Sequence, residues 1–190
     1  MRFAHEMNDP YRYPWGPQNG NRPEDFVAAW KHVHLIFQKM GATNVLWVWS
    51  PHISMPWFEY YYPGDEFVDW IATGVLNYGD TATWSRWWTF HQIIEKSYPA
   101  LVALKKPIMI SEFGTLSQGG DMAEWYRQAF YHMTHTYSRG VSGVVLTLGG
   151  AAACREARAR SPVATSRASP STAPRRSTRS AVRSAASPAR

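Results

Sequence analysis

Short runs of apolar, β-forming residues recur along this chain, and segments with helical spacing of apolar residues lie between them. The apolar runs occupy residues 44–49, 67–76, 107–111 and 141–148, and the helical segments occupy residues 23–40, 84–96 and 122–137. Strand, loop and helix repeated every ~35 residues are typical of βα units, whose strands run parallel. The pattern therefore predicts an α/β fold with four parallel strands.

The repeat is too short to close a full barrel. Eight βα units take about 250 residues, whereas the repeat fills only residues 1–149. Residues 2–5 are extended in character and end at Glu6, so we expect them to finish a further strand. The sequence predicts a partial TIM (β/α)8 barrel as one domain over residues 1–149.

Charge and aromatic content separate two kinds of binding surface. The chain holds ten Trp residues, more than a core of this size needs, and flat rings stack on sugars and on nucleobases alike. Its net charge of +6 comes from residues 154–190, which carry nine Arg and one Glu. The aromatic part is therefore slightly acidic, which favours a neutral polysaccharide partner over nucleic acid.

Residues 150–190 consist almost entirely of Ala, Arg, Ser and Pro. Such a segment buries too little apolar surface to offset its ordering entropy, so we expect a disordered C-terminal tail. Two origins remain open, a basic tail that binds polyanions and a shifted reading frame of GC-rich DNA. A nucleic-acid-binding protein that acts through this tail is thus a functional alternative.

The chain carries few signals for compartment or cofactor. The single cysteine, Cys154, excludes an internal disulfide framework and a Cys-based metal cluster. Residues 1–20 lack the apolar stretch of a signal peptide, and no run of 18 apolar residues could cross a membrane. We expect no membrane partner, and the localisation stays unknown from this chain.

Two glutamates follow predicted strands. Glu6 comes after residues 2–5, and Glu112 comes after the run at 107–111. The carboxyl ends of barrel strands meet at one mouth, so the two side chains can converge. Two facing carboxyl groups are what glycosidic bond hydrolysis requires. Most strand-end carboxylates, however, only cap helices or contact solvent, and the residues alone leave that alternative open.

Five motifs along the chain resemble glycoside hydrolase family 26. They are RFAHEMN at residues 2–8, YPWG at 13–16, NVLWVWSP at 44–51, YPGD at 62–65 and PIMISEFG at 107–114. The likeness covers about residues 1–148, in the order in which the family carries these motifs. That family consists mainly of endo-β-1,4-mannanases, with some β-glucanases and xylanases, and its members are retaining (β/α)8 enzymes.

The resemblance implies roles for single residues. Glu6, at the end of the fourth barrel strand, would be the general acid/base, and Glu112, at the end of the seventh, the nucleophile. The chain would then hold about strands four to eight and act as a retaining, endo-acting glycoside hydrolase on β-1,4-mannan or a related plant β-glycan. The expected substrate-binding residues are His5, Asn8, Trp15, Trp49, Tyr78 and Trp84. No metal or organic cofactor is implied.

The sequence also departs from the family at one strand end. Leu76 stands where many relatives carry a Tyr that bonds the nucleophile, and Tyr78 could replace it only if the strand continues. A non-catalytic carbohydrate-binding barrel is therefore the alternative function. Without strands one to three we expect this polypeptide alone to be poorly soluble and nearly inactive. An intact member is expected to be a secreted or periplasmic monomer.

Overall fold

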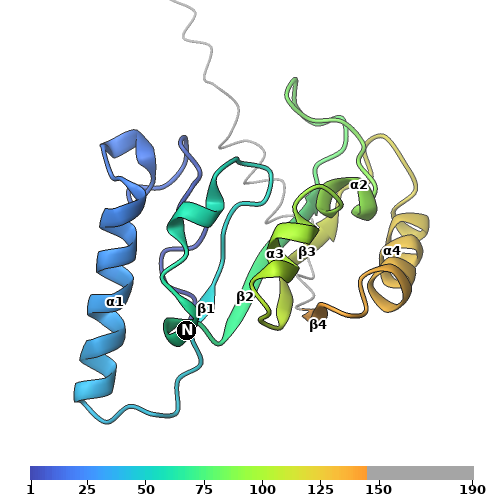
Figure 1. Cartoon of the computed structure of the whole chain (residues 1–190). Helices are drawn as coiled ribbons and strands as arrows, with labels where there is room; N and C mark the ends of the chain where they lie inside the picture. The colour runs from blue at the N-terminus through green and yellow to red at the C-terminus, as the bar shows by residue number, and fades with distance from the viewer. Residues whose placement is uncertain (145–190) are drawn as a thin grey trace, which may run out of the picture.

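A four-stranded parallel sheet forms the centre of the molecule (Figure 1). The structure, a computed structural model, describes residues 1–144, so the predicted tail and the second half of the last predicted strand lie outside the described residues. The strands are β1 (Val48–Trp49), β2 (Trp70–Asn77), β3 (Ile108–Thr115) and β4 (Val141–Val144), paired in the order β1-β2-β3-β4. The predicted parallel α/β fold is confirmed.

One α-helix precedes β1, and the others lie between β2 and β3 and between β3 and β4. The helices are α1 (Pro23–Lys39), α2 (Phe90–Ile94), α3 (Tyr98–Ala103) and α4 (Met122–Tyr131), and a π-helical turn at His132–Thr136 extends α4. Figure 1 shows α1 beyond the β1 end of the sheet and α4 toward the β4 end. Among the described residues, no helix combines the length and the apolar character that a membrane span requires.

The ends of α1 follow from its sequence. Pro23 occupies the first turn, where its missing N–H costs nothing, and the Asp25 carboxylate accepts the Arg22 backbone N–H at 2.9 Å. Gly41 follows the helix with a φ of +70°, a left-handed conformation that glycine adopts without strain. The predicted helix at 23–40 is therefore confirmed to within one residue.

The predicted helix at 84–96 is wrong in its first half. The side-chain oxygen of Asn77, at the end of β2, accepts the backbone N–H groups of Gly79 and Trp88, and these bonds hold the segment between them as a loop. The helix begins only after Thr89, whose hydroxyl accepts the Gln92 N–H. Thr89 and Gln92 form a capping box, which sets the start of α2.

β1 is shorter than the sequence predicts, and the strand predicted at residues 2–5 does not form. Only Val48–Trp49 of the run at 44–49 pairs with β2, and residues 2–5 form no strand. The amino-terminal segment still runs along this edge, because the Val48 N–H donates to the Met1 carbonyl at 2.9 Å and the Glu6 N–H donates to Ser50. Glu6 therefore lies beside the carboxyl end of β1.

Most of the aromatic excess serves the core. Trp30, Trp49, Phe90 and Phe113 are fully buried, and Trp125 is nearly so. The buried indoles donate to backbone carbonyls, Trp30 to Phe67 at 3.0 Å, Trp49 to Tyr61 at 3.0 Å and Trp125 to Trp88 at 2.8 Å. Burying large rings with their N–H groups satisfied gives this short sheet a firm packing surface.

A β-bulge lies at the point where Glu112 enters the sheet. Thr73 pairs with Ile110 and Gly74 pairs with Glu112, so Ser111 is the extra residue on β3. Glu112 therefore lies inside β3, not after it as the sequence predicts. Bulges of this kind redirect side chains and are frequent next to active sites.

Candidate active site

The two predicted carboxylates face the same glycine. Glu6 Oε1 and Glu112 Oε2 each lie 3.9 Å from the point where a Cβ on Gly74 would stand. The two oxygens are therefore no farther apart than twice that distance. Residues that are distant in sequence converge here because β2 and β3 pair directly, while the amino-terminal segment is held beside β1.

The other oxygen of each carboxylate binds an arginine. Arg2 bridges two neighbours on β3, with Nη2 at 2.8 Å from Glu112 Oε1 and Nη1 donating to Ser111 Oγ at 2.8 Å. Arg12 Nη1 lies 3.0 Å from Glu6 Oε2. Each carboxylate thus has one oxygen fixed by a charge-assisted hydrogen bond and the other turned toward Gly74.

The backbone at Glu6 is held in an unusual conformation. Glu6 has a φ of +52°, in the left-handed region that side chains rarely adopt, and it is only 8% exposed. Such a residue costs about 1–3 kcal/mol and persists only where its surroundings fix it. Here its N–H donates to Ser50, and Arg12 holds its side chain.

The loop after Glu6 folds back over His5. Tyr13 Oη lies 2.9 Å from His5 Nε2, and the Trp15 indole donates to the His5 carbonyl at 2.9 Å. The rings of Tyr13 and Trp15 stack with centroids 4.7 Å apart and an interplanar angle of 6°. The turn requires Gly16, since a Cβ there would stand 2.5 Å from the Asp9 carbonyl oxygen.

Burial shifts the pKa values of two side chains in this part of the chain. Burial, reinforced by the Glu6 carboxylate, raises the pKa of Tyr13 well above its usual range, so the phenol keeps its proton. Burial and the neighbouring Arg2 charge lower the pKa of His5 below its ordinary value of 6.5. His5 is therefore neutral near pH 7 and hydrogen-bonds with Tyr13 as an uncharged ring.

The lowered pKa of His5 makes stability depend on pH. As the pH falls from neutral through 6.5, the unfolded chain takes up a proton on His5 that the folded chain resists, so the free energy of unfolding falls. His5→Gln removes that contribution. Urea unfolding at pH 7.5 and 5.5 should show a smaller fall for His5→Gln than for the parent, and equal falls would contradict the assignment.

Asn8 links the site to the loop that follows β1. Its Nδ2 donates to the His52 carbonyl at 3.0 Å, and its Oδ1 accepts the His52 N–H at 2.8 Å. These bonds place His52 Nε2 at 4.0 Å from Glu6 Oε1. Asn8 thus lies near the acid/base candidate, as predicted, but its amide binds backbone groups.

Three potential metal-ligand side chains meet at this place. The ligand atoms of Glu6, Asp9 and His52 lie within 4.8 Å of one another. Glu6 Oε2 already binds Arg12, and Asp9 Oδ1 accepts the Tyr11 N–H at 2.8 Å. The guanidinium supplies the positive charge that such a cluster needs.

The structure separates the other predicted substrate-binding residues. Trp15 is half-buried in the loop over His5. Trp49 is fully buried and is a core residue, so the prediction that it contacts sugar is wrong. β2 ends at Asn77, which leaves Tyr78 in the following loop, 7% exposed, with its ring 5.4 Å from that of Trp84. Trp84 is 43% exposed.

Sequence reasoning missed the residues that hold the carboxylates. Arg2, Arg12, Tyr13 and Ser111 make polar contacts around the pair, yet none of these four was among the predicted site residues. A buried carboxylate needs a cation or hydrogen-bond donors. Arg2 and Arg12 were therefore the residues to search for once both glutamates were predicted to meet inside a fold.

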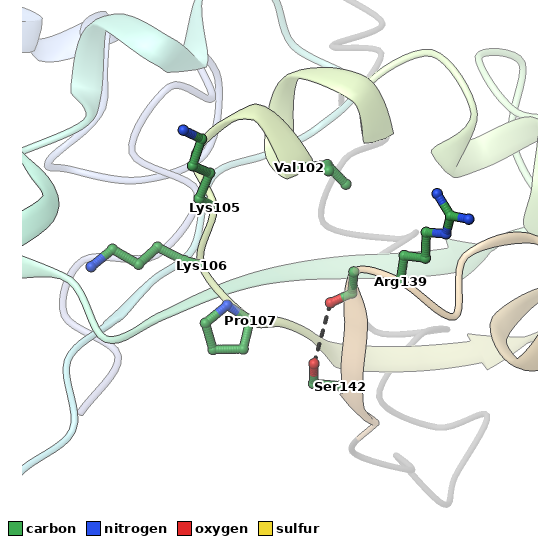
Figure 2. A pocket seen from close by; sticks show the side chains of 7 residues that line it. Val102, Lys105, Lys106, Pro107, Arg139 and Ser142 are labelled. Atoms are coloured by element: carbon green, nitrogen blue, oxygen red, sulfur yellow. Dashed lines mark hydrogen bonds between the residues drawn. The ribbon is translucent and has the colours of Figure 1, made fainter.

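A cavity of about 340 Å³ lies at the opposite, amino end of β3 and β4. Lys105, Lys106 and Arg139 line it, but Figure 2 shows these three side chains pointing in different directions, with no common focus for a ligand. Lys106 Nζ donates to the Asp65 carbonyl at 2.7 Å. The cavity therefore lies at the opposite end of the sheet from the two carboxylates.

Two curated proteins are similar in sequence. Endoglucanase H of Acetivibrio thermocellus is 34% identical over 152 residues, which is 76% of this chain and 17% of that protein. Mannan endo-1,4-beta-mannosidase A and B of Caldalkalibacillus mannanilyticus is 27% identical over 120 residues, 60% of this chain and 21% of that protein. The chain thus spans about a fifth of the length of these relatives.

Solved structures share the fold. The Bacillus subtilis mannanase BCman matches with a TM-score of 0.53 and 22% identity, and GH26C from Muricauda sp. matches with 0.54 and 21%. Each match covers 75% of this chain and 40% of the solved one, which supports a TIM-barrel-like fold. The sequence model of Glycosyl hydrolase family 26 matches residues 1–138. The chain therefore belongs to glycosyl hydrolase family 26.

Proposed function

We propose that this chain carries the catalytic pair of a retaining, endo-acting hydrolase of β-1,4-mannan or a related plant β-glycan. Glu6 is the general acid/base and Glu112 is the nucleophile. One observation carries the proposal: Glu6 Oε1 and Glu112 Oε2 face one point at Gly74, while an arginine holds the other oxygen of each.

The reaction uses the carboxyl groups of Glu6 and Glu112 together. Glu6 gives its proton to the glycosidic oxygen while Glu112 attacks the anomeric carbon, which forms a covalent glycosyl-enzyme and releases the leaving sugar. Glu6 then takes a proton from water, and the water oxygen displaces Glu112 with a second inversion, so the anomeric configuration is kept. Arg2 and Ser111 support this by fixing Glu112 Oε1, which leaves Oε2 directed to the sugar.

The separation of the two carboxyls fits this chemistry. Retaining enzymes hold the carboxyl groups about 5–5.5 Å apart, which is closer than the gap an inverting enzyme needs for its water. The shared 3.9 Å distances to the Gly74 position allow that spacing. The stacked rings of Tyr13 and Trp15 beside Glu6 offer a flat apolar surface of the kind that sugar rings contact.

Residues 1–144 supply one part of a barrel in this proposal, about strands four to eight. The 40% coverage of the matching solved structures supports this reading. An assay of the site therefore needs both the 190-residue chain and a completed barrel, in which residues 1–144 are joined to the part of the Bacillus subtilis mannanase that they do not match. A cooperative thermal transition shows whether the completed barrel folds.

The test of the function is hydrolysis with its stereochemistry. Both proteins are incubated with β-mannan, mixed-linkage β-glucan and xylan, and reducing ends are measured. Proton NMR of the first product formed from an oligosaccharide then gives its anomeric configuration. The proposal predicts internal cleavage of at least one β-glycan, with the β-anomer formed first. A first product in the α-configuration contradicts the retaining mechanism, and binding without cleavage by a folded completed barrel would support the non-catalytic alternative.

Gly74→Ala tests whether the space between the carboxyls is used. The added methyl group would stand 3.6 Å from Glu112 Cβ and 3.9 Å from each facing oxygen, which is ordinary contact, so the thermal midpoint should change little. It fills the point that both oxygens face, and we expect kcat/KM to fall by about tenfold or more, which is about 1.4 kcal/mol.

The matched control is Gly143→Ala on β4, whose added methyl would meet neighbours at 3.7 and 3.8 Å. It should change neither quantity. Equal kcat/KM values for the two variants in the completed barrel would show that the sugar does not approach Gly74.

A further inference from the structure

Arg12 contacts the proposed acid/base, yet the reaction steps above give it no part. Its Nη1 lies 3.0 Å from Glu6 Oε2, with the Arg12 side chain 20% exposed and the Glu6 side chain 11% exposed. The guanidinium carbon also lies 5.0 Å from the centroid of the Tyr13 ring. Water screens an ion pair in such surroundings far less than a surface pair.

The contact gives the two oxygens of Glu6 different surroundings. Oε2 binds Arg12, whereas Oε1 lies 3.9 Å from the Gly74 position and 4.0 Å from His52 Nε2. A hydrogen bond to Oε2 opposes rotation of the carboxyl group about its terminal torsion, which is otherwise broad and soft. Oε1 therefore stays turned toward Glu112, on the side where a glycosidic oxygen would lie.

Arg12 thus fixes one oxygen of Glu6 and leaves the other facing Gly74. We propose that Arg12 is a positioning residue for Glu6, which keeps Oε1 directed at the bond to be cleaved. This inference rests on the proposed function.

The positioning effect is measured in the completed barrel. Arg12→Lys keeps the charge but lacks the planar fork, so kcat on an oligosaccharide should fall by about tenfold. With a dinitrophenyl glycoside, whose leaving group needs no proton, the glycosyl-enzyme should form at the parent rate. The control is Arg22→Gln, which removes an exposed arginine that pairs with Asp25 and should change neither rate.

The outcomes separate this inference from the proposed function. If the parent barrel cleaves a β-glycan and Arg12→Lys has the same kcat, or loses the same factor on both substrates, the positioning role of Arg12 is overturned. If a folded completed barrel with Arg12 in place cleaves no β-glycan, the proposed function itself fails.

Discussion

Replacing Glu112 with Gln should abolish hydrolysis of every β-glycan that the completed barrel cleaves, with kcat lower by about 10⁴-fold or more. The amide keeps the size of the side chain and can still accept a hydrogen bond from Arg2, so folding should be preserved. It cannot form the glycosyl ester on which the first step depends. This loss is about 5 kcal/mol or more of transition-state stabilisation.

The matched control for this change is Glu95→Gln. Glu95 is exposed beside α2 and pairs with His91 at 3.0 Å on the surface, so its amide variant should keep full activity. Initial rates for both variants, together with their thermal midpoints, give the answer. A Glu112→Gln protein that keeps more than about a tenth of the parent kcat would remove Glu112 from the reaction.

Glu6→Gln should show a loss that depends on the leaving group. On an oligosaccharide, whose leaving oxygen must be protonated, kcat/KM should fall by about 10²–10⁴-fold. On a dinitrophenyl glycoside the first step needs no acid, so glycosyl-enzyme should form rapidly and then accumulate because the water lacks its base. Azide, which attacks without a base, should speed turnover and give a β-glycosyl azide.

This pattern discriminates the two glutamates from one another. Glu112→Gln should lose activity on both substrates to the same extent. Azide should not restore this activity, because no glycosyl-enzyme forms in the first step. If Glu6→Gln instead lowers the activity on the oligosaccharide and on the dinitrophenyl glycoside to the same extent, without rescue by azide, Glu6 is not the acid/base. Both glutamates are largely removed from water, so neither result would reflect a surface ion pair.

The elements that sequence predicted well are those with local signals. α1 was predictable because Pro23, the acidic first turn and Gly41 mark its ends around a periodic apolar face. The parallel sheet was predictable because its apolar runs recur in order. The start of α2 was not, since Asn77 holds the segment before it through hydrogen bonds to residues 79 and 88, which no helical pattern records.

The same distinction holds for the site. Glu6 and Glu112 were found as strand-end carboxylates, and the structure brings them to one point. Their partners were not found, because Arg2 meets Glu112 across 110 residues of chain and the contact depends on tertiary packing alone. Trp49 was predicted to contact sugar, but its ring is fully buried in the core and its indole donates to the Tyr61 carbonyl.

The most direct test of the account is covalent trapping of the nucleophile. A dinitrophenyl 2-deoxy-2-fluoro β-glycoside of cellobiose or mannobiose slows the second step, so that a retaining enzyme keeps the sugar on its nucleophile. Mass spectrometry of the intact completed barrel, and of its peptides, locates the added mass. The account predicts one adduct per chain, on Glu112, absent in Glu112→Gln and still formed in Glu6→Gln. An adduct on another residue, or turnover of the parent substrate with no adduct at any time, would contradict it.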